Sequence, residues 1–221
     1  MHSPPKLGSA AAIVGAIFLV AGTILHPSGA DPADAAAAFS EYAADRLWIA
    51  SHLAQFIGVV FMFFGLVALA DTLRDETTGW LARLGVHTAV AALAATAILQ
   101  AVDGVALKAM VDVLASAGPD QKQSSHLAAL AVRQIEIGTA GSTAILFGAA
   151  VVLLAIAVVM SVKYPNWLGW LGVAGGIGTI AGGILCAFTG FSKIEMNVAM
   201  PSNLMLVIWM GLIGTWMWRQ V

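Results

Sequence analysis

Charged residues are scarce in this 221-residue chain: Lys, Arg, Asp and Glu make up 10% of it, against 60% hydrophobic residues and a mean hydropathy of +0.89. Soluble domains average about 25% charged residues, so a water-soluble globule is excluded and the lipid bilayer is the expected surroundings. The few basic residues form no stripe and the net charge is −2, which excludes a nucleic-acid partner. The single cysteine, Cys186, excludes intrachain disulfides and cysteine-based metal sites.

Long hydrophobic runs are what the sequence has instead. A helix needs about 20 mostly apolar residues to cross a bilayer, and six runs are of this kind. We therefore predict an all-α fold, a polytopic membrane protein whose six transmembrane helices form a single domain over residues 1–221. The expected spans are residues 7–25, 48–73, 80–107, 137–162, 167–191 and 203–218.

Six spans put both chain ends on one side of the membrane, here named side A, with side B opposite. The first span is longer than the apolar part of a secretory signal, so we expect it to be retained as a helix. Lys and Arg residues divide evenly between the two sides, so the positive-inside rule does not determine the orientation in the membrane. Four acids gather in one side B loop and favour the outside for side B: Asp31, Asp34, Glu41 and Asp45. We therefore expect a plasma-membrane protein with cytoplasmic termini.

Two similar segments open the third and fifth spans. Trp80–Val86 and Trp167–Val173 match at five of seven positions. The match predicts a parallel repeat of two helical hairpins, one made by the second and third spans and the other by the fourth and fifth. Sites in proteins built from such repeats tend to lie between the repeats. Interfacial tryptophans are common at helix starts, so the similarity can also arise without a duplication.

The fifth span is rich in glycine. Gly172 and Gly176, and likewise Gly178 and Gly182, are spaced so that neighbouring backbones can approach closely. The two pairs face different sides of the helix, which predicts a central span that packs against several neighbours. A homo-oligomer formed through this span is the alternative.

Polar residues inside the spans gather near side B. Three adjacent spans each carry two of them at a spacing of three residues, which places both on one helix face. A charge facing lipid costs about 2.5–3.5 kcal/mol, so these faces should turn inward and form a polar pocket that opens to side B. The candidate pocket residues are His52 and Gln55, Gln100 and Asp103, Arg133 and Glu136, together with His26 at the end of the first span.

Two segments outside the membrane are expected to cover this pocket. A short helix over residues 32–44 follows Asp31 as its N-cap and Pro32 as its first residue. A second helix begins near Ser124 and continues into the fourth span, so that it projects from the membrane on side B.

Three kinds of function fit these residues. The first is binding, sensing or transport of a small polar or amphipathic molecule in the pocket. The second is redox or metal chemistry, with haem b or a metal ion bound through His26 and His52, or acid–base chemistry by a histidine beside a carboxylate. The third is a purely structural or partner-subunit role, in which His52 pairs with Asp103 and Arg133 with Glu136 and no cavity is left. The sequence contains no nucleotide-binding or hydrolase motif, so it does not establish whether the protein is an enzyme.

Several short motifs resemble those of small bacterial six-span membrane proteins of unknown function. The resemblance covers most of the chain and implies the same six-span fold, but it carries over no catalytic role. The motifs are His26-Pro27, Asp31-Pro32, Trp48 with His52, Asp103-Gly104, and the run from Trp167 to Gly172.

Overall fold

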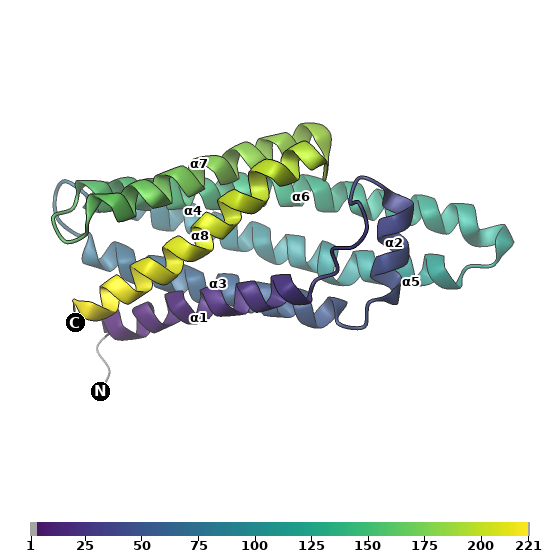
Figure 1. Ribbon diagram of the computed structural model, residues 1–221, viewed down its shortest axis with the longest axis horizontal. Coiled ribbons are helices and arrows are strands. Elements are labelled where there is room, and N and C mark those ends of the chain that lie inside the picture. The colour runs from purple at the N-terminus through teal and green to yellow at the C-terminus, as the bar shows by residue number, and fades with distance from the viewer. Residues whose placement is uncertain (1–3, 221) are drawn as a thin grey trace.

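The computed structural model describes residues 4–220, and they form a bundle of long helices with no strand among them, which confirms the all-α prediction. The start of α1 and the end of α8 lie at one end of the bundle, which is side A (Figure 1). The helices are α1 (Pro4–Leu25), α2 (Ala35–Ala44), α3 (Trp48–Thr72), α4 (Gly79–Gln100), the π-helix η1 (Ala101–Leu107), α5 (Lys108–Ser116), α6 (Pro119–Met160), α7 (Asn166–Thr189) and α8 (Lys193–Arg219).

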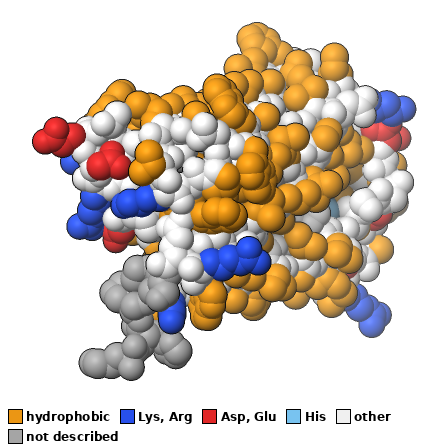
Figure 2. All heavy atoms as spheres, turned by 60° about the vertical axis from the view of Figure 1, so that its left-hand side comes forward, with side chains coloured by type: hydrophobic (Ala, Val, Ile, Leu, Met, Phe, Trp, Pro, Cys, Tyr) orange, Lys and Arg blue, Asp and Glu red, His pale blue; other side chains and the backbone are white. Residues whose placement is uncertain are grey.

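Six helical segments among the described residues are long and apolar enough to cross a membrane, as predicted. Two of them, Gly79–Ser116 with 38 residues and Pro119–Met160 with 42, far exceed the length that a bilayer requires. At 1.5 Å per residue they extend about 57 and 63 Å, so both project beyond the membrane on side B. Figure 2 shows the corresponding surface, a broad hydrophobic band with charged side chains gathered toward its two ends.

Three helices begin well away from the residues that the sequence suggested. Helix α6 starts at Pro119, directly after the break at Gly118, rather than near Ser124. Helix α2 starts at Ala35, because the Asp34 side chain, rather than that of Asp31, accepts hydrogen bonds from the first turn. Helix α8 starts at Lys193, ten residues before the expected span, because Ser192 caps it and the helix continues through Pro201. A proline inside a membrane helix is tolerated where neighbouring groups satisfy the backbone.

The buried apolar side chains form two separate clusters. The larger, here called the membrane core, joins α1, α3, α4, α6, α7 and α8. The smaller, here called the head core, joins α2, the start of α3, η1, α5 and the projecting part of α6. The head core consists of Ala38, Phe39, Tyr42, Trp48, Leu107, Val111, Leu114 and Ala129.

Glycines bring α6 and α7 into backbone contact. A Cβ atom built on Gly148 would lie 2.6 Å from the carbonyl oxygen of Gly176, and one built on Gly175 would lie 2.7 Å from Leu206 Cδ2 on α8. Helix α7 therefore packs closely on two neighbours through different faces. Oligomerisation through this helix and the internal repeat of hairpins both stay predictions.

Gly148→Ala should destabilise the protein by about 1–3 kcal/mol, because the added methyl group forces two backbones apart. Thermal unfolding of the purified protein in detergent measures the effect. Gly138→Ala is the matched control on the same helix, since a Cβ there meets nothing within 4 Å. Equal melting temperatures for the two variants would contradict the close α6–α7 contact.

Candidate functional site

Helix α6 carries a buried ion pair where it leaves the membrane. The side chains of Arg133 and Glu136 are 4% and 5% exposed, and Arg133 Nη1 lies 3.4 Å from Glu136 Oε2. The same nitrogen donates to the hydroxyl of Tyr42 at 3.3 Å, and Nη2 donates to the carbonyl oxygen of Pro32 at 3.0 Å. The guanidinium also lies over the rings of Phe191 and Tyr42, so charge, hydrogen bonds and aromatic faces all hold it in place.

A second buried pair links α3 to η1. His52 Nε2 lies 3.0 Å from Asp103 Oδ2, while His52 Nδ1 lies 2.7 Å from the carbonyl oxygen of Trp48. A carbonyl oxygen can only accept, so Nδ1 carries a proton. The contact between Nε2 and Asp103 then requires a further proton, held by either the imidazole or the carboxyl group. Gly104 makes this approach possible, since a Cβ on it would lie 2.9 Å from His52 Cβ.

Asp103 lies in the π-helix, where the backbone departs from regular α-helical pairing. Single π-turns inside α-helices occur frequently at functional sites. Here the carbonyl oxygen of Asp103 accepts a hydrogen bond from the indole N–H of Trp48 at 3.1 Å. One side chain of α3 thus fixes the backbone position from which the Asp103 carboxylate extends.

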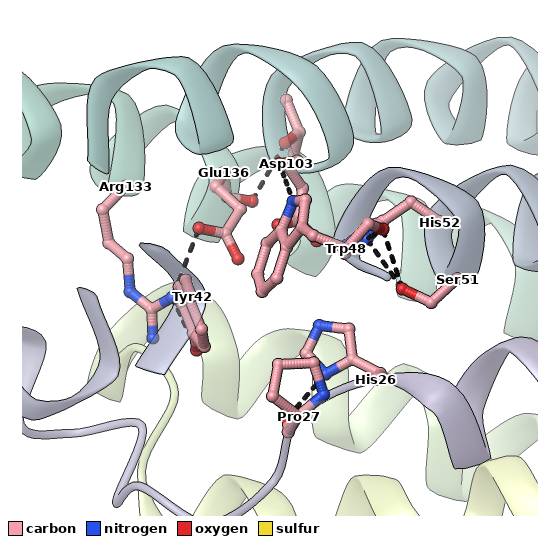
Figure 3. Close-up of polar contacts among 10 residues, drawn as sticks. His26, Pro27, Tyr42, Trp48, Ser51, His52, Asp103, Arg133 and Glu136 are labelled. Atoms are coloured by element: carbon pink, nitrogen blue, oxygen red, sulfur yellow. Dashed lines mark hydrogen bonds and ion pairs between the residues drawn. The ribbon is translucent and has the colours of Figure 1, made fainter. Parts of the chain in front are cut away.

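Aromatic rings fill the space between the two ion pairs (Figure 3). The ring centroids of Tyr42 and Trp48 lie 4.4 Å apart, and those of Trp48 and His52 lie 4.5 Å apart. The His26 ring lies 5.0 Å from both Trp48 and His52. The structure therefore brings five of the predicted residues to one place, here called the side B cluster: His26, His52, Asp103, Arg133 and Glu136.

The two glutamines are placed less closely. The side chain of Gln55 lies against Gly22 on α1, one turn below His52, where it has no hydrogen-bond partner among residues 4–220. Gln100 ends α4 just before η1, and its Oε1 atom is buried without a hydrogen-bond partner. Neither amide makes a hydrogen bond to the side B cluster.

Helix α2 covers the side B cluster from the side away from the membrane. Besides the Arg133 contacts, Lys108 Nζ donates to the carbonyl oxygen of Ala43 at 3.0 Å. An exposed ion pair of 3.6 Å joins Lys193 to Asp31 in the segment before α2. The cover, which consists of α2 and the segment before it from Asp31, is therefore attached to α5, α6 and α8 at separate points.

The open pocket expected at this place is not confirmed. The side chains of the side B cluster pack against one another and against α2, and Asp103 at 18% exposed is the most accessible member of the two ion pairs. Two cavities of about 450 and 400 Å³ lie at side A instead, and neither is lined by a residue of the side B cluster. The packing is close because Tyr42 of α2, which is 7% exposed, occupies the space where we expected an open pocket.

Several polar atoms in this packed region lack partners. His52 Nε2 and Asp103 Oδ1 are buried and make no hydrogen bond, although Nε2 lies within ion-pair distance of the other Asp103 oxygen. His26 Nδ1 is 2.8 Å from the carbonyl oxygen of Pro27, to which it must donate, so Nε2 of the neutral ring is an acceptor without a partner among residues 4–220, but this ring is only half-buried. Unpaired buried polar groups are rare and each cost roughly 1–3 kcal/mol.

The placement of the two histidines does not favour the metal or haem site that the sequence allowed. Both nitrogens of His52 face protein oxygens, which leaves no free lone pair directed away from Asp103 and Trp48. Among the residues that the structure describes, no group of three His, Cys, Asp or Glu side chains is placed to hold a metal ion. One free nitrogen, on His26, is not enough for a bis-histidine haem.

Sequence reasoning did not include Tyr42, Trp48 and Phe191 among the site residues. One signal was present, because Trp48 and His52 are four residues apart and share a helix face. The contacts of Tyr42 and Phe191 with Arg133 depend on the path of two loops, which the sequence pattern does not specify.

Burial and the neighbouring His52 lower the pKa of His26 below its usual value of 6.5. As the pH falls below about 6.5, His26 takes up a proton more readily in the unfolded chain than in the folded protein. The folded protein therefore loses stability in this pH range. Melting temperatures between pH 8 and pH 5 should fall more steeply for the wild type than for His26→Gln. Parallel curves for the two proteins would show that His26 does not contribute.

Arg133→Met should cost about 3–5 kcal/mol, because it leaves the Glu136 carboxyl group buried without its cation. Arg133→Met combined with Glu136→Met should recover part of this loss, as measured by thermal unfolding in detergent. Arg74→Met is the matched control, since the Asp71–Arg74 pair has the same spacing but is exposed and should contribute no more than about 1 kcal/mol. Similar losses of stability in Arg133→Met and Arg74→Met would show that burial does not increase the contribution of the Arg133–Glu136 pair.

Comparison with known proteins places the chain in a family. No curated protein and no solved structure matches it. Residues 7–217 match the sequence profile described as a domain of unknown function, DUF4386, and this range includes most of each spanning helix. The expected resemblance to membrane proteins of unknown function is thereby confirmed. The chain, with six helical segments long and apolar enough to cross a membrane, belongs to the DUF4386 family.

Proposed function

We propose that the side B cluster binds a small amphipathic molecule whose polar head donates hydrogen bonds. The observation that carries this proposal is Asp103 Oδ1, a buried acceptor without a partner. A second unpaired acceptor, Nε2 of the half-buried His26, lies beside the same aromatic rings. A bound donor such as an amine or a hydroxyl group would satisfy them. Such a ligand removes the free-energy cost that the buried Asp103 Oδ1 atom imposes on the closed structure.

The surroundings of these atoms favour a ligand with an apolar part. Trp48 and Tyr42 present ring faces beside the cluster, and the membrane core begins directly below it. Aromatic rings and carboxylates together also favour a positively charged head, since both attract cations. The Arg133 guanidinium shows this chemistry already, because it lies over Tyr42 and next to Glu136.

Access to Asp103 requires movement of α2, which closes the cluster on side B. The contacts of Arg133 with Tyr42 and Pro32 hold this cover together with the Lys108–Ala43 and Lys193–Asp31 contacts. All of them can break while the Arg133–Glu136 pair remains. With cytoplasmic termini, as the acidic side B loop favours, the ligand enters from outside the cell.

A structural role is the second candidate, and the closed packing of the cluster favours it. In that case the two ion pairs only attach the head to the membrane helices, as interhelical polar contacts commonly do. Substitution of Asp103 would then change stability without changing any response to small molecules. The two proposals are therefore separable in one experiment.

The test compares octylamine, octanol and octanoate, which share a chain but differ in the head group. We expect octylamine and octanol to raise the melting temperature of the purified protein and octanoate, which lacks a donor at neutral pH, to have no such effect. Asp103→Asn should weaken the octylamine response about tenfold in apparent affinity, because it removes a charge-assisted hydrogen bond.

Asp120→Asn is the control for this measurement. It makes the same change on an exposed residue in the first turn of α6, away from the cluster. Its octylamine response should equal that of the wild type. Equal responses of the wild type to all three compounds, or an unchanged response in Asp103→Asn, would favour the structural role.

A further inference from the structure

A crevice of about 400 Å³ opens at side A, far from the side B cluster. It lies between the end of α3 and the beginning of α4, the two helices of one hairpin. One part of its wall is apolar and the other is charged. The lining residues are Val67, Ala70, Asp71, Arg74, Gly79, Ala82, Arg83, Val86 and His87.

The charged part of the wall is positive overall. Asp71 and Arg74 form an ion pair, so their charges offset each other. Arg83 and His87 are exposed and make no hydrogen bond or ion pair within residues 4–220. They are four residues apart on α4 and therefore share one helix face toward the crevice. The wall thus has a guanidinium and an imidazole that lack protein partners.

The position of these groups along α4 is unusual for basic residues. Arg83 and His87 lie about 6 and 12 Å from the first residue of the helix, Gly79, at 1.5 Å per residue. The helix dipole disfavours positive charge near an N-terminus and favours a bound anion there. Trp80, which is 51% exposed, marks the level of the membrane interface at the same end. The two basic side chains are therefore at the depth of lipid head groups and glycerol backbones.

Acidic residues of the adjacent loop do not neutralise the crevice. Asp75 accepts hydrogen bonds from the backbone and hydroxyl of Thr78, and these bonds lower the pKa of its carboxyl group. Neither Asp75 nor Glu76 lines the crevice. An anion from outside the chain is thus the missing partner of Arg83.

We propose that this crevice binds one anionic phospholipid, with its phosphate at Arg83 and His87 and an acyl chain along Val67 and Val86. A free phosphate ion would use the charged wall but leave the apolar wall empty. A phospholipid matches both walls, and the membrane supplies it at the required depth.

Native mass spectrometry of the full chain in detergent tests this proposal. The probes are dioleoyl phosphatidylglycerol, dioleoyl phosphatidylcholine and inorganic phosphate, each titrated separately. We expect one phosphatidylglycerol to bind in preference to phosphatidylcholine, and inorganic phosphate to bind much more weakly. Arg83→Gln should weaken phosphatidylglycerol binding about tenfold, as for the loss of one charge-assisted hydrogen bond.

Two further variants separate the alternatives. Lys6→Gln removes a charge from α1 at side A, outside the crevice, and its lipid binding should equal that of the wild type. Val86→Phe fills the apolar wall while it retains the charges, so it should weaken lipid binding even if Arg83→Gln does not fold. Equal binding of the two lipids, unchanged binding in both crevice variants, or phosphate binding as tight as lipid binding would overturn the proposal.

Discussion

The buried guanidinium of Arg133 is the group on which the arrangement of side B depends. It lies between the head core and the membrane core, where a charge without partners would be costly. Its partners come from separate parts of the chain: Glu136 from its own helix, Tyr42 and Pro32 from the cover, and Phe191 from the loop after α7. One side chain thus orients the cover and that loop relative to α6.

The sequence was sufficient to predict the six spans and the depth of the polar residues, because both follow from hydropathy and helical periodicity. Both ion pairs, Arg133 with Glu136 and His52 with Asp103, belonged to one of the alternatives, the purely structural role. The filling of the space between them was not predictable. It depends on how α2 docks, and the docking depends on loop paths that periodicity does not describe.

The residues at which helices begin were also only partly predictable from the sequence. Asp31 and Asp34 are both good N-caps, and only the three-dimensional path of the loop selects Asp34. Helix α8 starts ten residues before the expected span and continues through Pro201, although proline usually breaks or kinks a helix. Inside a membrane the cost of an unpaired backbone favours continuation of the helix, so the local rule is overridden.

The π-helix η1 has a geometric consequence for everything that follows it. A π-turn holds an additional residue compared with an α-helical turn, and each residue of an α-helix turns the chain by about 100°. Without η1, the side chains of α5 would be rotated by about that angle, and Val111 and Leu114 would no longer face Phe39 in the head core. The π-helix that positions Asp103 therefore also sets the direction in which the side chains of α5 point. A change in η1 would affect the head core and the side B cluster together.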